Sequence, residues 1–160
     1  MIMKAKQFDE ARDAIVKAML VDKAHCKDSV YCVRQCTGLG GFVKTLNRFM
    51  PELRNKHFPT AEIVREYFLD NLDELNELGV YIDQEVNIRN QDNVWLFGKC
   101  TGTISSDRIK FFNIVVNDDA DVTINALPYT LQKIYIKSQD AVVKFNKAQT
   151  ATQIINRLQK

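Results

Sequence analysis

Two hydrophobic periodicities divide the chain near residue 79. Before that residue, apolar positions recur every three or four residues, which is the spacing of a helix with one buried face. The clearest stretches are residues 7–20, 42–49 and 60–78. After it, short β-branched runs alternate apolar and polar positions, as strands with one buried face do. The pattern predicts a helical first half and a β-rich second half.

The helical half carries signals for where helices begin and end. Thr60 follows a proline and is a candidate N-cap, because its hydroxyl can accept a hydrogen bond from a first-turn amide. Gly79 suits the position just after a helix end. A break is expected near residues 70–71, and a further short helix should end near Cys36. The segment therefore holds three to four predicted helices.

The β-rich half contains eight predicted strands. They are Val80–Ile82, Val86–Ile88, Val94–Phe97, Thr101–Ile104, Ile109–Val116, Val122–Ile124, Lys133–Ile136 and Ala141–Phe145. Strands that recur every 8–12 residues or so are typical of all-β barrels, sandwiches and solenoids.

A turn phrase that contains Asp recurs before several of these strands. It reads Gln-Asp-Asn-Val at 91–94, Asp-Asp-Ala-Asp-Val at 118–122 and Gln-Asp-Ala-Val at 139–142, with a looser copy at 106–109. An antiparallel meander typically uses Asn-Gly or Asp-Gly hairpins, and the sequence contains neither. Asp in such turns accepts hydrogen bonds from nearby backbone amides. A repeated corner favours a short β-solenoid or roll, with the meander as the alternative.

The last segment is predicted to be a short helix. Thr150 and Gln153 form a capping box ahead of apolar residues. The sequence thus predicts an α+β fold with a helical head at 1–79, a β-repeat body at 80–146, and a C-terminal helix or docking tail at 147–160. We expect these segments to form one compact unit, with helices capping the stack of strands.

Three short motifs within residues 60–146 carry a family resemblance. They are Leu-Gly-Val-Tyr-Ile at 78–82, the run at 94–98, and the repeated Asp-Ala-x-Val turns. In these features the chain resembles proteins of Bacteroidota phages and prophages with a helical head and a short degenerate β-repeat body. The repeats here are themselves degenerate, with an irregular insertion at 127–130. The resemblance implies a mobile-element context and no activity.

Composition and charge narrow the expected partners. The 160 residues are 46% hydrophobic and 26% charged, which is ordinary for a soluble globular protein. The net charge is only +2, so nucleic acid is not an expected partner, but the charge is segmental. Residues 1–59 carry +5, residues 60–100 carry −6 and residues 101–160 carry +3. Such segments can orient a docking protein or a second copy, although solvated helix faces explain them equally simply.

The expected location follows from the absence of targeting patterns in the sequence. The N-terminus lacks the apolar region of a secretory signal. The apolar runs are also too short to span a membrane. We therefore expect the protein in the cytoplasm of the producing cell, with the virion as a second location and no membrane partner.

Candidate chemistry is confined to a few thiols and imidazoles. The chain has four cysteines, Cys26, Cys32, Cys36 and Cys100, and two histidines, His25 and His57. The first three cysteines lack the paired spacing of structural zinc sites, so buried thiols in a reduced compartment are expected. The sequence also lacks phosphate-loop, dinucleotide, zinc-protease and nucleophile-elbow signatures. We predict that the protein is not an enzyme and that it binds no metal or cofactor. A metal site formed by the Cys/His cluster is the alternative.

Two regions are candidates for an interaction surface. They comprise Trp95 and Tyr135 on the predicted strands, and Asp70, Asp73, Glu74 and Glu77 on one helix face. An exposed tryptophan on a β surface can anchor a partner, although core packing explains it equally well. The acidic residues could imitate a phosphate backbone or bind a hard cation. A solvated helix face is their simpler interpretation.

Three functions are consistent with the sequence. The preferred one is a non-enzymatic interaction or assembly protein of a bacteriophage that binds a protein partner or itself, with attachment to the virion as one form of this role. The first alternative is a phage-encoded inhibitor that blocks a host defence system by direct protein binding. The second is a small enzyme that depends on a metal or on cysteine.

Overall fold

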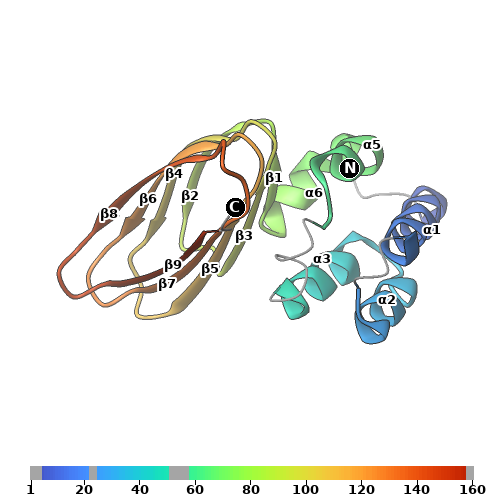
Figure 1. Cartoon of the computed structure of the whole chain (residues 1–160), viewed down its shortest axis with the longest axis horizontal. Coiled ribbons are helices and arrows are strands. Elements are labelled where there is room, and N and C mark those ends of the chain that lie inside the picture. The colour runs from blue at the N-terminus through green and yellow to red at the C-terminus, as the bar shows by residue number, and fades with distance from the viewer. Residues whose placement is uncertain (1–4, 22–24, 51–57, 158–160) are drawn as a thin grey trace. The chain divides into compact units, whose positions relative to one another are not determined.

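The computed structural model describes residues 5–21, 25–50 and 58–157, and the chain divides into two compact units, Met1–Leu78 and Gly79–Lys160 (Figure 1). Helices form the first unit and parallel strands form the second, so the predicted α+β fold is confirmed. The predicted boundary at residue 79 lies beside this division. Residues 147–157 belong to the second unit and form no separate segment.

The described part of the helical unit consists of short helices. They are α1 (Ala5–Val21), α2 (Lys27–Arg34), α3 (Leu39–Arg48), α5 (Ala61–Phe68), a 3-10 turn η2 (Leu69–Asn71) and α6 (Leu72–Glu77). Thr60 caps α5 as predicted, since its hydroxyl accepts a hydrogen bond from the Ile63 amide at 3.4 Å. The predicted break near residues 70–71 is the 3-10 turn. None of the described helices is long and apolar enough to cross a membrane.

The second unit is a β-solenoid of about four turns. Its described strands are β1 (Val80–Ile82), β2 (Glu85–Arg89), β3 (Asn93–Phe97), β4 (Thr101–Ser106), β5 (Phe111–Val116), β6 (Asp121–Ala126), β7 (Leu131–Ile136), β8 (Val142–Lys147) and β9 (Thr152–Arg157). The odd-numbered strands form a five-stranded sheet, and β2, β4, β6 and β8 form a four-stranded sheet.

Every pair of neighbouring strands in these sheets is parallel, which confirms the solenoid and excludes the meander. Asn93 pairs with Asn113 and Asn113 with Lys133, so one turn of this part of the solenoid takes 20 residues. Figure 1 shows the chain alternating between the two sheets from β1 to β9. Because each turn supplies one strand to each sheet, strands recur about every ten residues.

The solenoid core lies between the two sheets. It is built from alternate residues of β2 to β7 and from three corner residues, all almost fully buried: Val86, Ile88, Val94, Leu96, Cys100, Ile104, Ile114, Val116, Ala120, Val122, Ile124, Ile134, Ile136 and Ala141. Three of these are small residues placed just before paired strand positions in successive turns, namely Cys100, Ala120 and Ala141. The alanine of the recurring turn phrase is therefore the residue that fills the inside of a corner. Cys100 fills the same position one turn earlier.

Two aspartates at this kind of corner, Asp83 and Asp118, link neighbouring turns of the solenoid. Asp118 accepts a hydrogen bond from the Gly98 amide at 2.8 Å, and Asp83 accepts one from the Lys99 amide at 2.9 Å. Both aspartates have positive φ, 53° and 49°, a region that Asp tolerates better than most residues. The sequence predicts bonds to nearby backbone, and the structure places the acceptor and the donor in adjacent turns. We call the turns from the five-stranded to the four-stranded sheet, residues 83–84, 98–100, 117–120 and 137–141, the Asp corner.

The predicted C-terminal helix is wrong, because residues 152–157 form strand β9. The segment pairs in parallel with β7, and the Gln153 side-chain amide donates to the Gln132 side-chain oxygen at 2.9 Å. A capping box is worth about 1 kcal/mol, and an isolated helix of this length is marginal in water. Pairing along a whole strand satisfies backbone donors and acceptors that a short helix leaves open.

The last described turn of the solenoid carries two basic residues, Lys147 on β8 and Arg157 on β9. Lys147 is in register with Ala126, and Arg157 is in register with Ile136. Both cations are exposed, and β8 and β9 are edge strands of the two sheets. The positions that Ala126 and Ile136 occupy in the preceding turn thus become basic at this edge.

Candidate interaction surfaces

The two aromatic residues predicted as surface anchors are buried. Trp95 is 0% exposed and Tyr135 is 4% exposed, although neither belongs to the core between the sheets. The Trp95 ring stacks on Phe97 with 6.2 Å between ring centroids. Neither ring is accessible in this structure, so these residues do not supply the exposed anchor that the strand pattern predicted.

The acidic residues lie together on the last helical segment of the first unit. Asp70 belongs to η2, and Asp73, Glu74 and Glu77 belong to α6. Three of the four are exposed and Glu74 is half-buried. The structure brings them onto one segment as predicted, and their use in binding stays a prediction.

The cysteines have structural contacts. The Cys26 thiol caps α2 by accepting a hydrogen bond from the Ser29 amide at 3.3 Å, and the Cys36 thiol donates to the Cys32 carbonyl at 3.2 Å. Burial raises the pKa of the Cys36 and Cys100 thiols above the ordinary value, which lowers their thiolate fraction.

Of the two histidines, the structure describes His25. His25 packs edge-on against Phe58 at 4.9 Å between ring centroids, and His57 lies outside the described residues. Within the described ranges, no three His, Cys, Asp or Glu residues are grouped as metal ligands. The metal alternative thus has no arrangement of described residues to support it.

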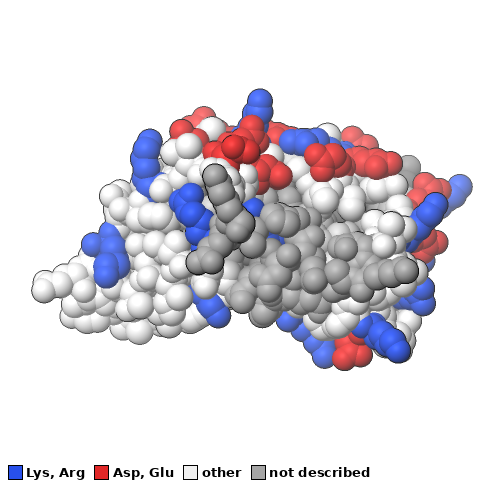
Figure 2. All heavy atoms as spheres, viewed as in Figure 1, with Lys and Arg blue, Asp and Glu red and all other residues white. Residues whose placement is uncertain are grey.

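A cluster of exposed apolar side chains lies on the opposite corner of the solenoid from the Asp corner. Its members are Ile109, Phe111, Leu127 and Tyr129, with 86%, 41%, 42% and 65% of their surfaces exposed. We call these four residues the apolar corner. Figure 2 shows the end of the solenoid that carries the turns entering β7 and β9, at the lower left, as mainly uncharged surface.

The apolar corner is confined to two adjacent turns of the solenoid. Ser106 pairs with Ala126 and Phe111 pairs with Leu131, so Ile109 and Tyr129 occupy equivalent positions. The corresponding turn before them is Asn-Gln-Asp at 90–92, and the one after them is Ala-Gln-Thr-Ala at 148–151. The same register shows that residues 127–130 replace the preceding turn residue for residue, so the predicted insertion is wrong.

Tyr129 has an unfavourable backbone conformation for its type. Its φ is 64°, and the Thr130 amide donates to the Leu127 carbonyl at 3.3 Å to close the turn. Pro128 precedes it, so Tyr129 stands where a type II turn requires positive φ and usually holds Gly or Asn. An L-residue with a bulky side chain costs about 1–2 kcal/mol in this region. The chain keeps a strained aromatic residue at an exposed position.

Basic residues border the apolar corner, while its carboxylates are already paired. Arg89 and Asn90 donate to Asp107, and Lys110 forms an ion pair with Asp92. The hydrogen bond from Arg89 lowers the pKa of Asp107 below its ordinary value, so this carboxylate stays ionised. Arg108, which is also exposed, lies beside Ile109. Two of these three cations are matched by carboxylates, and Arg108 leaves the border of the apolar corner with a net positive charge.

Sequence reasoning missed the apolar corner because it assigned these residues to other elements. Ile109 was expected inside a strand and Leu127 inside an insertion. The sequence did contain a signal for this surface. Leu-Pro-Tyr at 127–129 places two large apolar residues in a turn, where polar residues are usual.

The chain matches no protein-family model, and comparisons with curated proteins and with solved structures found no match either.

Proposed function

We propose that this protein is a non-enzymatic interaction protein that binds a partner protein through the apolar corner. The observation that carries the proposal is the contiguous exposure of four large apolar side chains on two adjacent turns. Scattered apolar residues are normal on a surface, but a discrete apolar cluster bordered by polar residues is typical of interaction sites.

The strain at Tyr129 supports the same conclusion. A positive φ at an exposed tyrosine lowers stability and gains no core contact in return. Strained positions cluster at functional sites, where the surrounding structure holds them in place. Tyrosine is also among the residues enriched at the centres of protein interfaces.

The chemistry around the corner defines the partner. Arg108 is exposed at the turn that holds Ile109, and none of the ion pairs between described residues involves it. We propose a partner surface with an apolar centre and acidic residues around it, because complementary charges steer association and fix orientation.

Photo-crosslinking tests the proposal in the cells that produce the protein. Replacing Tyr129 with p-benzoylphenylalanine keeps an aromatic ring at the corner, and the same replacement at exposed Gln139 probes the Asp corner as the matched control. We expect one discrete protein adduct from position 129, lost when Ile109→Ser is added. Ile109 is 86% exposed, so this substitution should change stability by less than about 0.5 kcal/mol.

The outcomes of the crosslinking experiment are distinct. The same adducts from both positions, or persistence of the position-129 adduct in the Ile109→Ser variant, would contradict binding through the apolar corner. An adduct between two copies of the chain would support the self-assembly form of the proposal.

The proposed setting is an assembly role in a bacteriophage, which rests on the family resemblance alone. Mass spectrometry of purified particles tests it separately. Absence of the protein from particles would remove a virion-associated role and would leave the binding proposal to the crosslinking result.

A further inference from the structure

A second concave surface lies in the helical unit, between α1 and α2. The cavity has a volume of about 630 Å³ and is lined by Met19, Leu20, His25, Lys27, Asp28, Val30, Tyr31 and Arg34. This volume is within the range of about 300–1,000 Å³ that holds small-molecule ligands.

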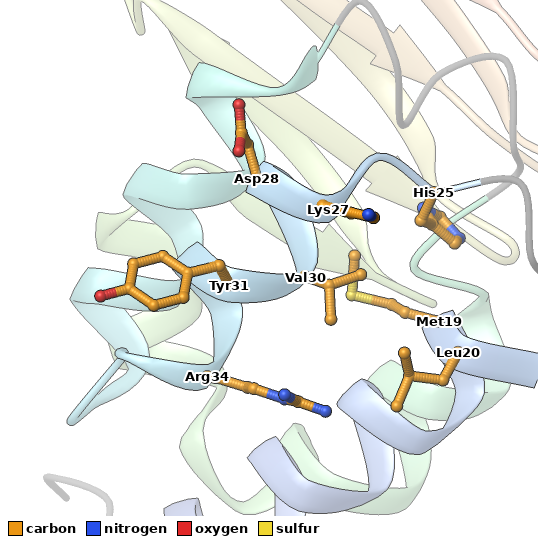
Figure 3. A pocket seen from close by; sticks show the side chains of 8 residues that line it. All are labelled: Met19, Leu20, His25, Lys27, Asp28, Val30, Tyr31 and Arg34. Atoms are coloured by element: carbon orange, nitrogen blue, oxygen red, sulfur yellow. The ribbon is translucent and has the colours of Figure 1, made fainter.

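The two helices supply the cavity with an apolar floor. Met19 from α1 and Val30 from α2 are buried, whereas Leu20 is 51% exposed beside them. Figure 3 shows Met19, Leu20, Val30 and Arg34 around the hollow, with Lys27 and His25 along its upper edge. Such a floor offers an apolar ligand a contact surface that is already formed.

The charged residues of the cavity are unbalanced toward cations. Lys27 and Arg34 lie one in the first and one in the last turn of α2, about 10 Å apart along the helix at 1.5 Å per residue. Neither forms an ion pair with another described residue. Asp28, the acidic residue of the lining, points away from the hollow in Figure 3. The cavity thus combines apolar contact with exposed cations.

Arg34 is placed to receive an anionic group. Its guanidinium extends across the hollow toward Leu20, next to the buried Val30 and Met19 side chains (Figure 3). A guanidinium binds a carboxylate with two parallel hydrogen bonds, which a lysine cannot reproduce. A ligand with its carboxylate on Arg34 would place its apolar part along the floor.

We propose that this cavity binds a small amphipathic carboxylate, such as a medium-chain fatty acid. The carboxylate pairs with Arg34, the alkyl chain covers Met19, Leu20 and Val30, and Lys27 adds to the positive field. The inference concerns a different unit from the apolar corner and does not rest on the proposed function.

Titration with decanoate, below the concentration at which it forms micelles, tests the site on the full chain. We expect saturable chemical-shift changes at the Met19 methyl group and the Val30 amide. Decanol, which has the same chain and no charge, should bind at least about tenfold more weakly, because a hydrogen bond to a charged group is worth about 1.5–3 kcal/mol.

Matched variants separate the proposed contacts from general charge effects. Arg34→Gln should weaken decanoate binding about tenfold or more, whereas Arg157→Gln, the same change at an exposed position of the solenoid, should leave it within about twofold. Leu20→Gln, at a half-exposed position, should weaken the binding of both decanoate and decanol. Tyr129→Asn should change neither affinity, which keeps this result separate from that of the proposed function.

Three results would overturn the inference. They are a lack of saturable shifts at Met19 and Val30, equal affinities for decanoate and decanol, and equal affinities of the Arg34→Gln and Arg157→Gln variants. The dispersion of the amide spectrum reports whether each variant is folded, so a loss of binding by unfolding is recognised directly.

Discussion

The two corners of the solenoid connect the same two sheets, yet their residues are used differently. At the Asp corner, small residues such as Ala120 fill the interior and Asp118 bonds to the backbone of the adjacent turn. At the apolar corner, Ile109 and Tyr129 occupy equivalent positions and extend into solvent. Folding accounts for the residues of the first corner. Folding does not account for the exposed residues of the apolar corner. For this reason we propose that the partner binds at the apolar corner.

The largest effect should come from overfilling the Asp corner. Ala120 is fully buried, so Ala120→Leu has to push apart adjacent turns and should lower the free energy of unfolding by about 3 kcal/mol. Chemical denaturation measures the change. Gln139→Leu adds the same side chain at an exposed position of this corner and should alter stability by less than about 0.5 kcal/mol. Similar losses in both variants would show that Ala120 has no special packing role.

A smaller loss is expected when an aspartate of the Asp corner is removed. Asp118→Gly deletes the acceptor for the Gly98 amide at a position whose positive φ Gly tolerates, and should cost about 1.5 kcal/mol, the lower end for hydrogen bonds to charged groups. Asp119→Gly, at the exposed neighbouring position, is the control, and its ion pair with Lys99, 3.9 Å long, contributes little. Equal denaturation midpoints for the two variants would argue that the recurring aspartate does not stabilise the stack.

At the apolar corner we expect a change of opposite sign. Tyr129→Asn places a residue that tolerates positive φ in the turn and should raise the free energy of unfolding by about 1 kcal/mol. The same variant should lose the partner that crosslinks at this corner. Tyr129→Phe keeps both the backbone strain and the aromatic ring. It should therefore change neither the free energy of unfolding nor the binding of the partner. If Tyr129→Asn lowers the melting temperature, the tyrosine is stabilising and the contrast between the corners fails.

The smallest effect concerns the charged border of the apolar corner. The hydrogen bond from Arg89 lowers the pKa of Asp107, so this pair contributes stability above the ordinary carboxyl pKa and loses it as pH falls through the lowered value. Arg89→Ala should therefore raise the pKa of Asp107 toward its ordinary value, which a carboxyl NMR titration measures. An unchanged pKa would show that Asn90 alone holds the carboxylate. In that case the ion pair between Arg89 and Asp107 would not link the two turns.

The repeated corner was readable from the sequence because its requirements are local. At the Asp corner, an aspartate followed by a small residue inside the bend recurs at 118–120 and at 140–141, and this repetition predicts a solenoid. The copies of the turn phrase at 91–94 and 106–109 lie at the opposite corner. The strand positions followed from alternation to within a few residues, since one face of each strand must be buried.

What could not be predicted depends on distant partners. Residues 152–157 carry a local helix signal, and only the adjacent β7 edge makes them a strand. Leu127–Thr130 looked like an insertion because the register that aligns it with residues 107–110 is set by pairing across turns. The positive φ at Tyr129 belongs to its own turn, since Ile109 at the equivalent position does not share it. The candidate site therefore became visible only in the structure.

The cations at the last described turn affect whether further strands can be added to this edge of the solenoid. A parallel stack presents open edges that can template the addition of further chains. Any strand added beyond β8 and β9 would have to enclose Lys147 and Arg157, which occupy the register of Ala126 and Ile136. Enclosing two unpaired cations is costly. The pair therefore opposes the addition of a further strand at this edge.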